Sequence, residues 1–205
     1  MGLFSKKETE EETVKRLASN AGNMIEMFKA YFNTPNGIDI RSALIFTSAL
    51  AGHACHRAVK AEGGIFAVVT TRAGKHFYFG DDVNKYLLES RLSVVSFCTA
   101  VTNVTEADVL SIASDQAMRI GEEPYTICGC DPERLYKQIS QCWDGIFDNM
   151  TSRYCKSPAE WPVLFGIVLQ NILITAINAG APKDEAGRIA AECAMAVSKM
   201  DEDSF

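Results

Sequence analysis

Basic residues are in short supply in this 205-residue chain. Lysine and arginine number 20 against 26 aspartates and glutamates, which gives a formal net charge of −6 and a sequence pI near 5.1. A protein that binds nucleic acid or an anionic membrane surface needs a mainly cationic surface to displace counterions. We therefore expect no nucleic acid and no membrane among its partners.

The familiar signatures of catalysis and cofactor binding are missing as well. The chain contains no GxSxG, P-loop or GxGxxG pattern, and each of these motifs marks a nucleophile or a phosphate cradle. It has only three histidines, and its seven cysteines include no C-x-x-C pair, the spacing typical of zinc ribbons and dithiol redox centres. We expect no metal and no cofactor, and the sequence leaves open whether the protein is an enzyme.

The first residues do not form an apolar leader. Met1 to Lys7 lacks the continuous apolar core of an export signal, and Lys6 stands where a myristoylation pattern has serine or threonine. The number of cysteines is odd and no export signal precedes them, so we expect the thiols to be reduced, as they are in the cytosol. We therefore expect a cytoplasmic protein.

Apolar sequence, in contrast, is plentiful, at 47% hydrophobic residues. A chain of this length can bury roughly 70% of its unfolded surface around one core. No repeat, low-complexity block or long linker divides it. We predict one domain over 1–205, with a flexible N-terminus at about 1–8 and an acidic C-terminal tail at about 201–205.

Helical spacing of apolar residues dominates the chain, so the predicted fold class is mainly α (α+β), a compact helical domain of about seven helices with one β-hairpin. The clearest helix signals are a capping box at Thr9 and Glu12, a Thr-Glu-Ala-Asp start at Thr105 and an Asp-Pro start at Asp131. Small residues along the second helix are expected to let a neighbouring helix approach closely. The stretch 92–103 is ambiguous, because its β-branched residues suggest a strand while its spacing favours a helix. The main helices are expected at about 9–32, 40–61, 92–103, 105–120, 131–150, 164–179 and 183–200.

One stretch, Trp161 to Ala181, is long and uncharged enough to resemble a membrane span. On a helical wheel, however, Asn171, Thr175 and Asn178 fall within about 60° of one another. A helix that is apolar apart from one polar stripe is typical of the centre of a soluble protein. We predict a buried helix whose Asn171 and Asn178 find hydrogen-bond partners.

The hairpin is predicted at about 65–79, with Gly74 in its turn. After it, Gly80 ends the strand, and Asp81 or Asp82 is expected to cap a short helix. Two adjacent aspartates can also bind a metal ion, but no further ligands stand near them in sequence. The cap is therefore favoured over the metal site.

The hairpin and the preceding helix carry the most distinctive charge pattern. The segment from His53 to Phe79 contains four basic residues and one acidic residue, Glu62. Its net charge is therefore +3, while that of the rest of the chain is −9. His53 and His56 are three positions apart and could share a ligand, whereas the Cys128-Gly-Cys130 sequence is a weak signal. The cationic segment could be an anion-binding patch or simply a set of solvated surface charges.

Two functional hypotheses follow. The first is a non-catalytic interaction protein that self-associates as a homodimer or binds a protein partner, with the 65–79 hairpin and the small-residue helix at 40–61 as candidate surfaces. For a homodimer, the hairpin and the last helix are the expected contact surfaces. The alternative is a small-molecule (anionic ligand) binding protein or enzyme, with a pocket near the 164–179 helix or the basic 53–79 segment. The candidate ligand-binding residues are His53, His56, Arg57, Arg72, His76, Asn171 and Asn178.

Overall fold

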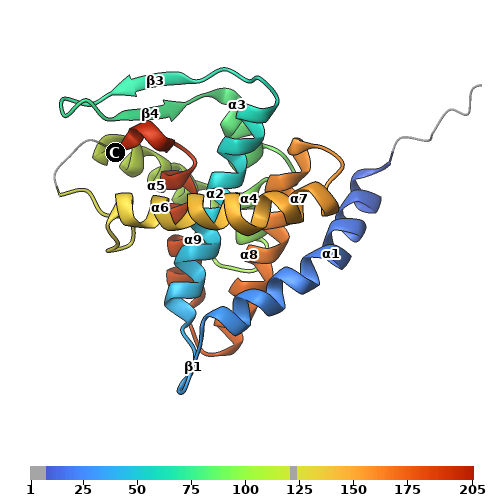
Figure 1. Ribbon diagram of the computed structural model, residues 1–205. Helices are drawn as coiled ribbons and strands as arrows, with labels where there is room; N and C mark the ends of the chain where they lie inside the picture. Colours follow the sequence, from blue (N-terminus) through green and yellow to red (C-terminus); the bar gives the residue numbers. More distant parts are fainter. Residues whose placement is uncertain (1–7, 121–123) are drawn as a thin grey trace, which may run out of the picture.

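The computed structural model describes residues 8–120 and 124–205, and it confirms a mainly helical domain with a β-hairpin (Figure 1). The expected flexible N-terminus falls almost wholly on residues outside this description. The helices, with their π- and 3-10-helical turns, are α1 Glu10–Tyr31, α2 Ile40–Ala61, α3 Asp81–Asn84 with η1 Lys85–Glu89, α4 Val94–Thr99, α5 Glu106–Arg119, α6 Pro132–Cys142, η2 Trp143–Phe147, α7 Asp148–Tyr154, η3 Pro158–Glu160, α8 Trp161–Asn178, α9 Lys183–Val197 and η4 Glu202–Ser204.

The predicted hairpin is confirmed as two antiparallel strands, β3 Ala67–Thr70 and β4 His76–Phe79. Gly74 has a φ of 81° in the turn between them, a conformation that glycine adopts without strain. A second, very small hairpin joins α1 to α2 through β1 Asn33–Thr34 and β2 Gly37–Ile38. The sequence indicated only a break there, since two-residue strands leave no periodic pattern.

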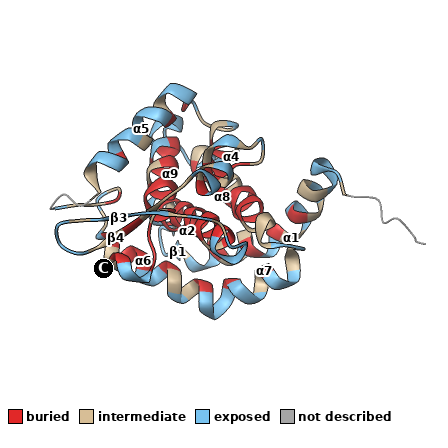
Figure 2. Ribbon diagram, turned by 90° about the horizontal axis from the view of Figure 1, so that it is seen from above, coloured by how far each residue is buried: buried red, intermediate tan, exposed pale blue. Residues whose placement is uncertain are grey.

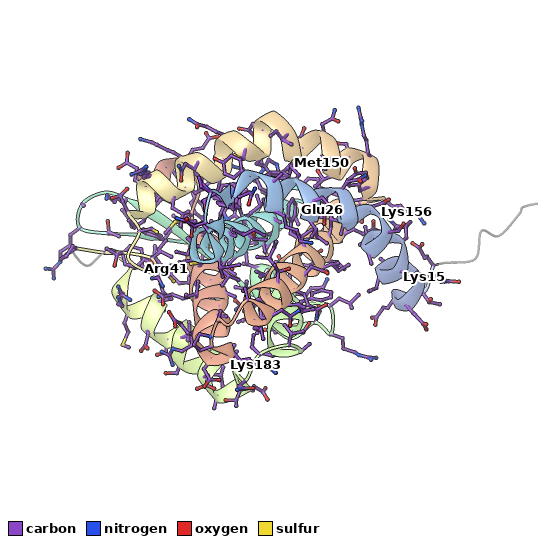
Figure 3. All side chains as sticks on the ribbon, turned by 90° about the horizontal axis from the view of Figure 1, so that it is seen from below. Lys15, Glu26, Arg41, Met150, Lys156 and Lys183 are labelled. Atoms are coloured by element: carbon purple, nitrogen blue, oxygen red, sulfur yellow. The ribbon has the colours of Figure 1, made fainter. Side chains whose placement is uncertain are left out.

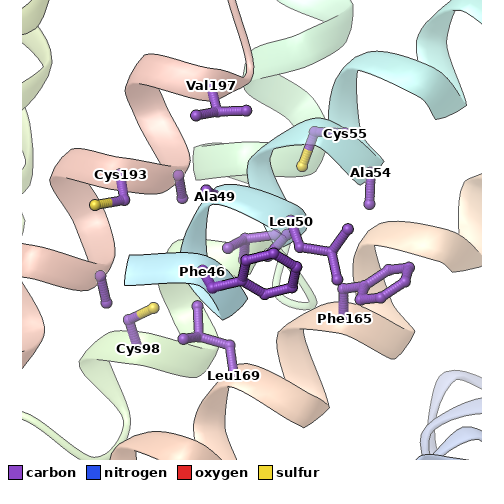
Figure 4. Packing of buried hydrophobic residues seen from close by; sticks show 14 of the residues in the cluster. Phe46, Ala49, Leu50, Ala54, Cys55, Cys98, Phe165, Leu169, Cys193 and Val197 are labelled. Carbon is purple, nitrogen blue, oxygen red and sulfur yellow. The ribbon is translucent and has the colours of Figure 1, made fainter. Parts of the chain in front are cut away.

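Helix α2 lies at the centre of the fold, between α8 and α9, and its burial is continuous over most of its length (Figures 1 and 2). Its small residues serve the predicted purpose of close helix packing. A β-carbon on Gly52 would overlap the backbone carbonyl of Ala194 in α9. Around this crossing, Leu50, Phe165 and Leu169 fill the core (Figure 4). Charged side chains such as Lys183 project outward around it (Figure 3).

Helix α8 is largely the buried helix that the sequence predicts. Ile167 is 5% exposed, but Ile174 is 40% exposed, so the last turns reach the surface. The segment Pro158–Asn178 is long and apolar enough to cross a membrane, yet 61% of its most apolar window is buried inside the protein. This burial is what a core helix of a soluble domain shows. Asn171 donates from Nδ2 to the Ile167 carbonyl at 2.9 Å, whereas Asn178 is exposed.

Strand β4 ends directly before Gly80, as predicted, but the prediction that Asp81 or Asp82 caps the following helix is wrong. Helix α3 begins at Asp81 with Gly80 as its N-cap, and no side chain caps it. The Asp82 carboxylate instead accepts the Ile65 N–H at 3.3 Å, which ties the start of the helix to the start of the hairpin. Gly80 is needed for space, because a β-carbon there would lie 2.8 Å from the Ile65 carbonyl oxygen.

The ambiguous stretch 92–103 contains a helix, α4, which Ser93 caps by accepting the Ser96 N–H. Apolar spacing along the chain predicts that Leu110 and Ile146 face inward, but both point outward. Leu110 is 64% exposed because α5 buries the face that carries Val109, Ile112 and Gln116, and Ile146 is 46% exposed. The reason at Ile146 is the π-helical turn η2, which adds a residue to the helical turn and shifts the register that a period of 3.6 predicts.

Helix α9 packs against α2 with its apolar stripe buried, and Ala190, Cys193 and Val197 are each 0% exposed. The expectation that the last helix offers an exposed contact surface is therefore wrong. The tail after it, by contrast, folds back over the protein and lies beside β4 in Figure 1.

Candidate functional site

The described structure gathers the end of α2, the hairpin and the C-terminal tail into one cluster centred on Asp201. His56, Arg57 and Lys60 come from the last turns of α2, and His76 comes from β4. Asp201 is only 8% exposed although it lies five residues from the end of the chain. The acidic tail is thus an ordered part of the fold, and its carboxylate at Asp201 contacts basic residues of the cationic segment 53–79.

Asp201 holds this cluster together through its side chain. Lys60 Nζ donates to Asp201 Oδ2 at 2.6 Å, and His56 Nε2 lies 3.3 Å from the same oxygen. Asp201 Oδ1 accepts the Glu202 N–H at 2.9 Å and the Tyr136 hydroxyl at 3.4 Å. Burial by itself would raise the pKa of Asp201, but the hydrogen bonds from His56 and Lys60 outweigh it and hold that pKa well below its usual range.

Neither ring nitrogen of His56 is available to a substrate. Nδ1 lies 3.2 Å from the Ser198 carbonyl oxygen, and Nε2 faces the Asp201 carboxylate. Both ring nitrogens therefore face protein atoms that accept hydrogen bonds. The ring is fully buried, stacked on Phe66 at 4.7 Å between centroids. This geometry suits a structural clamp between α2 and the C-terminal tail.

His53 lies in a different environment. It is 1% exposed, and neither ring nitrogen has a hydrogen-bond partner among the described residues. Its ring meets Trp143 and Tyr136 edge to face, with centroids 5.3 and 5.7 Å away. Burial lowers the pKa of His53 to about 3, so the ring is neutral at physiological pH. The two histidines that the sequence pairs therefore lie in different surroundings, His56 beside the C-terminal tail and His53 among aromatic rings.

Acidic residues lie beside two of the four basic residues in the cationic segment. Arg57 lies 3.8 Å from Asp144, and Lys60 is bonded to Asp201. The Tyr78 hydroxyl of β4 donates to both carboxylate oxygens of Asp203, at 2.7 and 2.6 Å. The complementary charge of segments 53–79 and 201–205 was visible in the sequence, and it was the signal that could have found this contact.

The remaining candidates are dispersed. Arg72 stands at the turn of the hairpin, and His76 Nδ1 is 3.0 Å from the Thr70 hydroxyl on the partner strand. Asn171 bonds to its own helix, and Asn178 lies at the exposed end of α8. Among the candidates, the structure therefore brings His56, Arg57 and the His76 backbone to the C-terminal tail, whereas Arg72, Asn171 and Asn178 lie apart from it.

Two clefts lie outside these residues. One of 510 Å³ separates the hairpin turn from the start of α6 and includes Lys75, Tyr125 and Phe205. The other, of 650 Å³, lies between the end of α1, the start of α2 and α6, and includes Tyr31 and Arg134. Within residues 8–120 and 124–205, no group of three or more His, Cys, Asp or Glu side chains could hold a metal ion.

The hairpin leaves one sheet edge open. The outer edge of β4 is covered by the tail, since Tyr78 N–H donates to the Lys199 carbonyl at 2.8 Å and Ser204 Oγ donates to the His76 carbonyl. The outer edge of β3 pairs with no strand in the described part of the chain. Every residue of β3 is exposed, and Val68 and Val69 are 52% and 48% exposed (Figure 2).

Comparison with known proteins gives no further assignment: no protein-family model, curated protein or solved structure matches this chain.

Proposed function

We propose that this is a non-catalytic, cytoplasmic interaction protein that self-associates by pairing the β3 edges of two copies. The observation that supports this is the open edge of β3, flanked by exposed Ile65, Val68 and Val69. An exposed apolar strand edge presents unpaired N–H and C=O groups and readily accepts another strand. The burial of both histidines of α2 supports the same proposal, because neither ring is open to a substrate at the cluster around Asp201.

The hydrogen-bond pattern between β3 and β4 defines which residues of β3 have backbone groups free to pair with a second copy. Thr71 N–H bonds to the Lys75 carbonyl at 2.8 Å, so the hydrogen-bonded pairs within the hairpin continue through Val69 and Ala67. The N–H and C=O groups of Val68 and Thr70 therefore point outward from the sheet. A second copy related by a two-fold axis would pair through these outward residues, with the axis at or beside Val68.

Charge favours this antiparallel arrangement. With the axis at Val68, Arg72 of one copy lies opposite Gly64 of the other, next to the Ile65 N–H that Asp82 accepts at 3.3 Å. Arg72 in the hairpin turn of each copy thus lies close to Asp82 of the other copy. The two-fold axis places one such contact at each end of the paired strands. β3 itself carries no charge, so like charges do not oppose one another along the strand.

The test is the mass of the protein in solution together with a matched pair of lysine variants. We expect light scattering at micromolar concentration to give twice the 22.5 kDa of one chain. Val68→Lys should shift the protein to monomer, because a charged edge residue blocks strand addition. Leu110→Lys, at another exposed apolar position, should leave the dimer intact. A wild-type monomer would contradict the proposal.

A small-molecule function is the second candidate, and the 510 Å³ cleft beside the hairpin favours it, since Lys75 and Thr71 line it. A cleft of this size suits a small ligand. Anionic metabolites tested by thermal shift would support this alternative if they raise the melting temperature of the wild type but not of Lys75→Ala.

A further inference from the structure

A tight turn at residues 127–130 holds a cysteine in an unusual backbone conformation. Ile127 and Cys130 exchange two backbone hydrogen bonds, of 3.0 and 2.8 Å. The residues between them, Cys128 and Gly129, have φ values of 50° and 82°. Positive φ at both central positions is typical of a type I′ turn, which favours Asn-Gly. Cys128 is the one non-glycine residue with positive φ in the described part of the chain.

This turn places Cys128 against Cys193 of α9. Their Sγ atoms are 3.2 Å apart, although the residues are 65 positions apart in sequence. Cys193 is fully buried, and its side chain points away from α2 (Figure 4). A disulfide bond is about 2.05 Å long, so the two sulfurs need to approach by roughly 1.2 Å.

Several contacts hold the turn at this distance while both thiols are reduced. Cys128 N–H donates to Glu192 Oε1 at 3.2 Å, and Arg41 Nη2 donates to the Cys128 carbonyl at 3.1 Å. Arg119 donates to the Thr126 carbonyl at 3.1 Å and lies 3.9 Å from Glu192. The dithiol is therefore positioned by both of its flanking elements, the turn and α9.

We propose that Cys128 and Cys193 are a redox-active pair that forms a reversible disulfide on exchange with a small-molecule disulfide. Cys128 is partly exposed, so its thiolate attacks one sulfur of the external disulfide and releases one thiolate. The sulfur of Cys193 then attacks the Cys128 sulfur of the mixed disulfide and expels the second thiolate. In sum, two protein thiols are oxidised to one disulfide, and the external disulfide is reduced to two thiols, which take up the two protons.

The difference in exposure between the two thiols is consistent with this order of attack, because Cys128 is partly exposed and Cys193 is buried. The hydrogen bond to Cys128 and burial raise the pKa of Cys193 well above its usual range, with the Cys193 thiol donating to the Cys128 sulfur. Cys55 and Cys98 are buried and have no such neighbour, and burial raises the pKa of Cys98 to about 12.

Disulfide formation would fix the wall between the two clefts. Gly129 and Cys130 line the 650 Å³ cleft, and Tyr125 and Asp131 line the 510 Å³ cleft. A covalent bond from Cys128 to α9 would hold this shared segment in one position. The inference is independent of the proposed dimer, because it involves neither strand of the hairpin.

The experiment treats the reduced full-length protein with excess oxidised glutathione, blocks free thiols by alkylation and analyses tryptic peptides without reduction. We expect one cross-link between peptides 120–134 and 189–199, with the other five of the seven cysteines alkylated. The melting temperature should rise by about 5–15 °C on oxidation and return on reduction. Because peptide 120–134 also contains Cys130, the Cys130→Ser variant should form the same cross-link.

Matched variants distinguish a specific disulfide between Cys128 and Cys193 from non-specific oxidation of cysteines. Cys128→Ser and Cys193→Ser should each lose the cross-link and the temperature shift, whereas Cys142→Ser should keep both. Seven alkylated thiols in the oxidised wild type, a bond between Cys128 and Cys130, or a lasting glutathione adduct on Cys128 would each overturn the proposal. The wild-type result decides the matter even if a variant fails to fold.

Discussion

Asp201 Oδ2 lies 3.3 Å from His56 Nε2, and this contact fastens the last residues of the chain to the end of the central helix. Lys60 donates to the same oxygen at 2.6 Å. The contact explains why the tail is ordered although it is acidic and terminal. It also explains why His56, one of only three histidines in the chain, has a structural role.

The first prediction concerns this clamp. Asp201→Asn keeps the shape of the side chain but removes its charge, leaving His56 and Lys60 without their anion. Because breaking one partner of a largely buried pair leaves the other uncompensated, we expect a loss of about 2–4 kcal/mol in the free energy of unfolding. Urea unfolding measures it. Asp203→Asn is the control, since Asp203 bonds only to the exposed Tyr78 hydroxyl and should cost under about 1 kcal/mol.

How much the sequence reveals depends on how far apart the contacting residues are. Caps at Thr9 and Thr105 were predictable, because each bonds three residues along the same chain segment. The capping error at Asp82 and the Asp201 clamp have one cause: both carboxylates bind groups far away in sequence, the Ile65 amide and the side chains of α2. Apolar periodicity records which face of a helix is buried, but it carries no information on which distant partner a polar group meets.

His53 provides the second prediction, on pH. Its pKa is about 3 in the folded protein and near 6.5 in the unfolded chain, so the unfolded state binds more protons below pH 6.5. The neutral ring does not reduce the free energy of unfolding above pH 6.5, but it reduces it progressively as the pH falls from 6.5 toward 3. Lowering the pH from 7 to 5 should therefore decrease the free energy of unfolding by about 2 kcal/mol through this group.

The measurement is the free energy of unfolding of wild type and His53→Phe across that range. We expect the variant to lose about 2 kcal/mol less than wild type between pH 7 and pH 5, whatever its stability at pH 7. Asp201 contributes at lower pH, because its depressed pKa makes its stabilisation fall away only as carboxylates protonate. Equal slopes in the two proteins would show that His53 titrates normally.

The third prediction concerns the crossing of α2 and α9. Gly52→Ala places a β-carbon on the Ala194 carbonyl, and two buried helices cannot separate without opening the core. We expect a loss of more than about 3 kcal/mol, or no folded protein. Gly22→Ala in α1 is the control: nothing lies within 4 Å of the added carbon, and alanine should stabilise that helix by up to about 1 kcal/mol. Similar melting temperatures for the two variants would contradict the packing argument.

The last prediction tests the register of the proposed dimer by exchanging charges. In a two-fold pairing of β3, Arg72 of each copy lies near Asp82 of the other, so Arg72→Glu and Asp82→Arg should each weaken the homodimer about 5–30-fold through two like-charge contacts. An equimolar mixture of the two variants restores an opposite-charge pair at both ends. We expect it to form a heterodimer about as strong as wild type, and salt should reduce the difference. Sedimentation of each variant and of the mixture measures this. If both variants dimerise like wild type, the strands do not pair in this register, and if the mixture remains monomeric, the lost affinity has a cause other than charge.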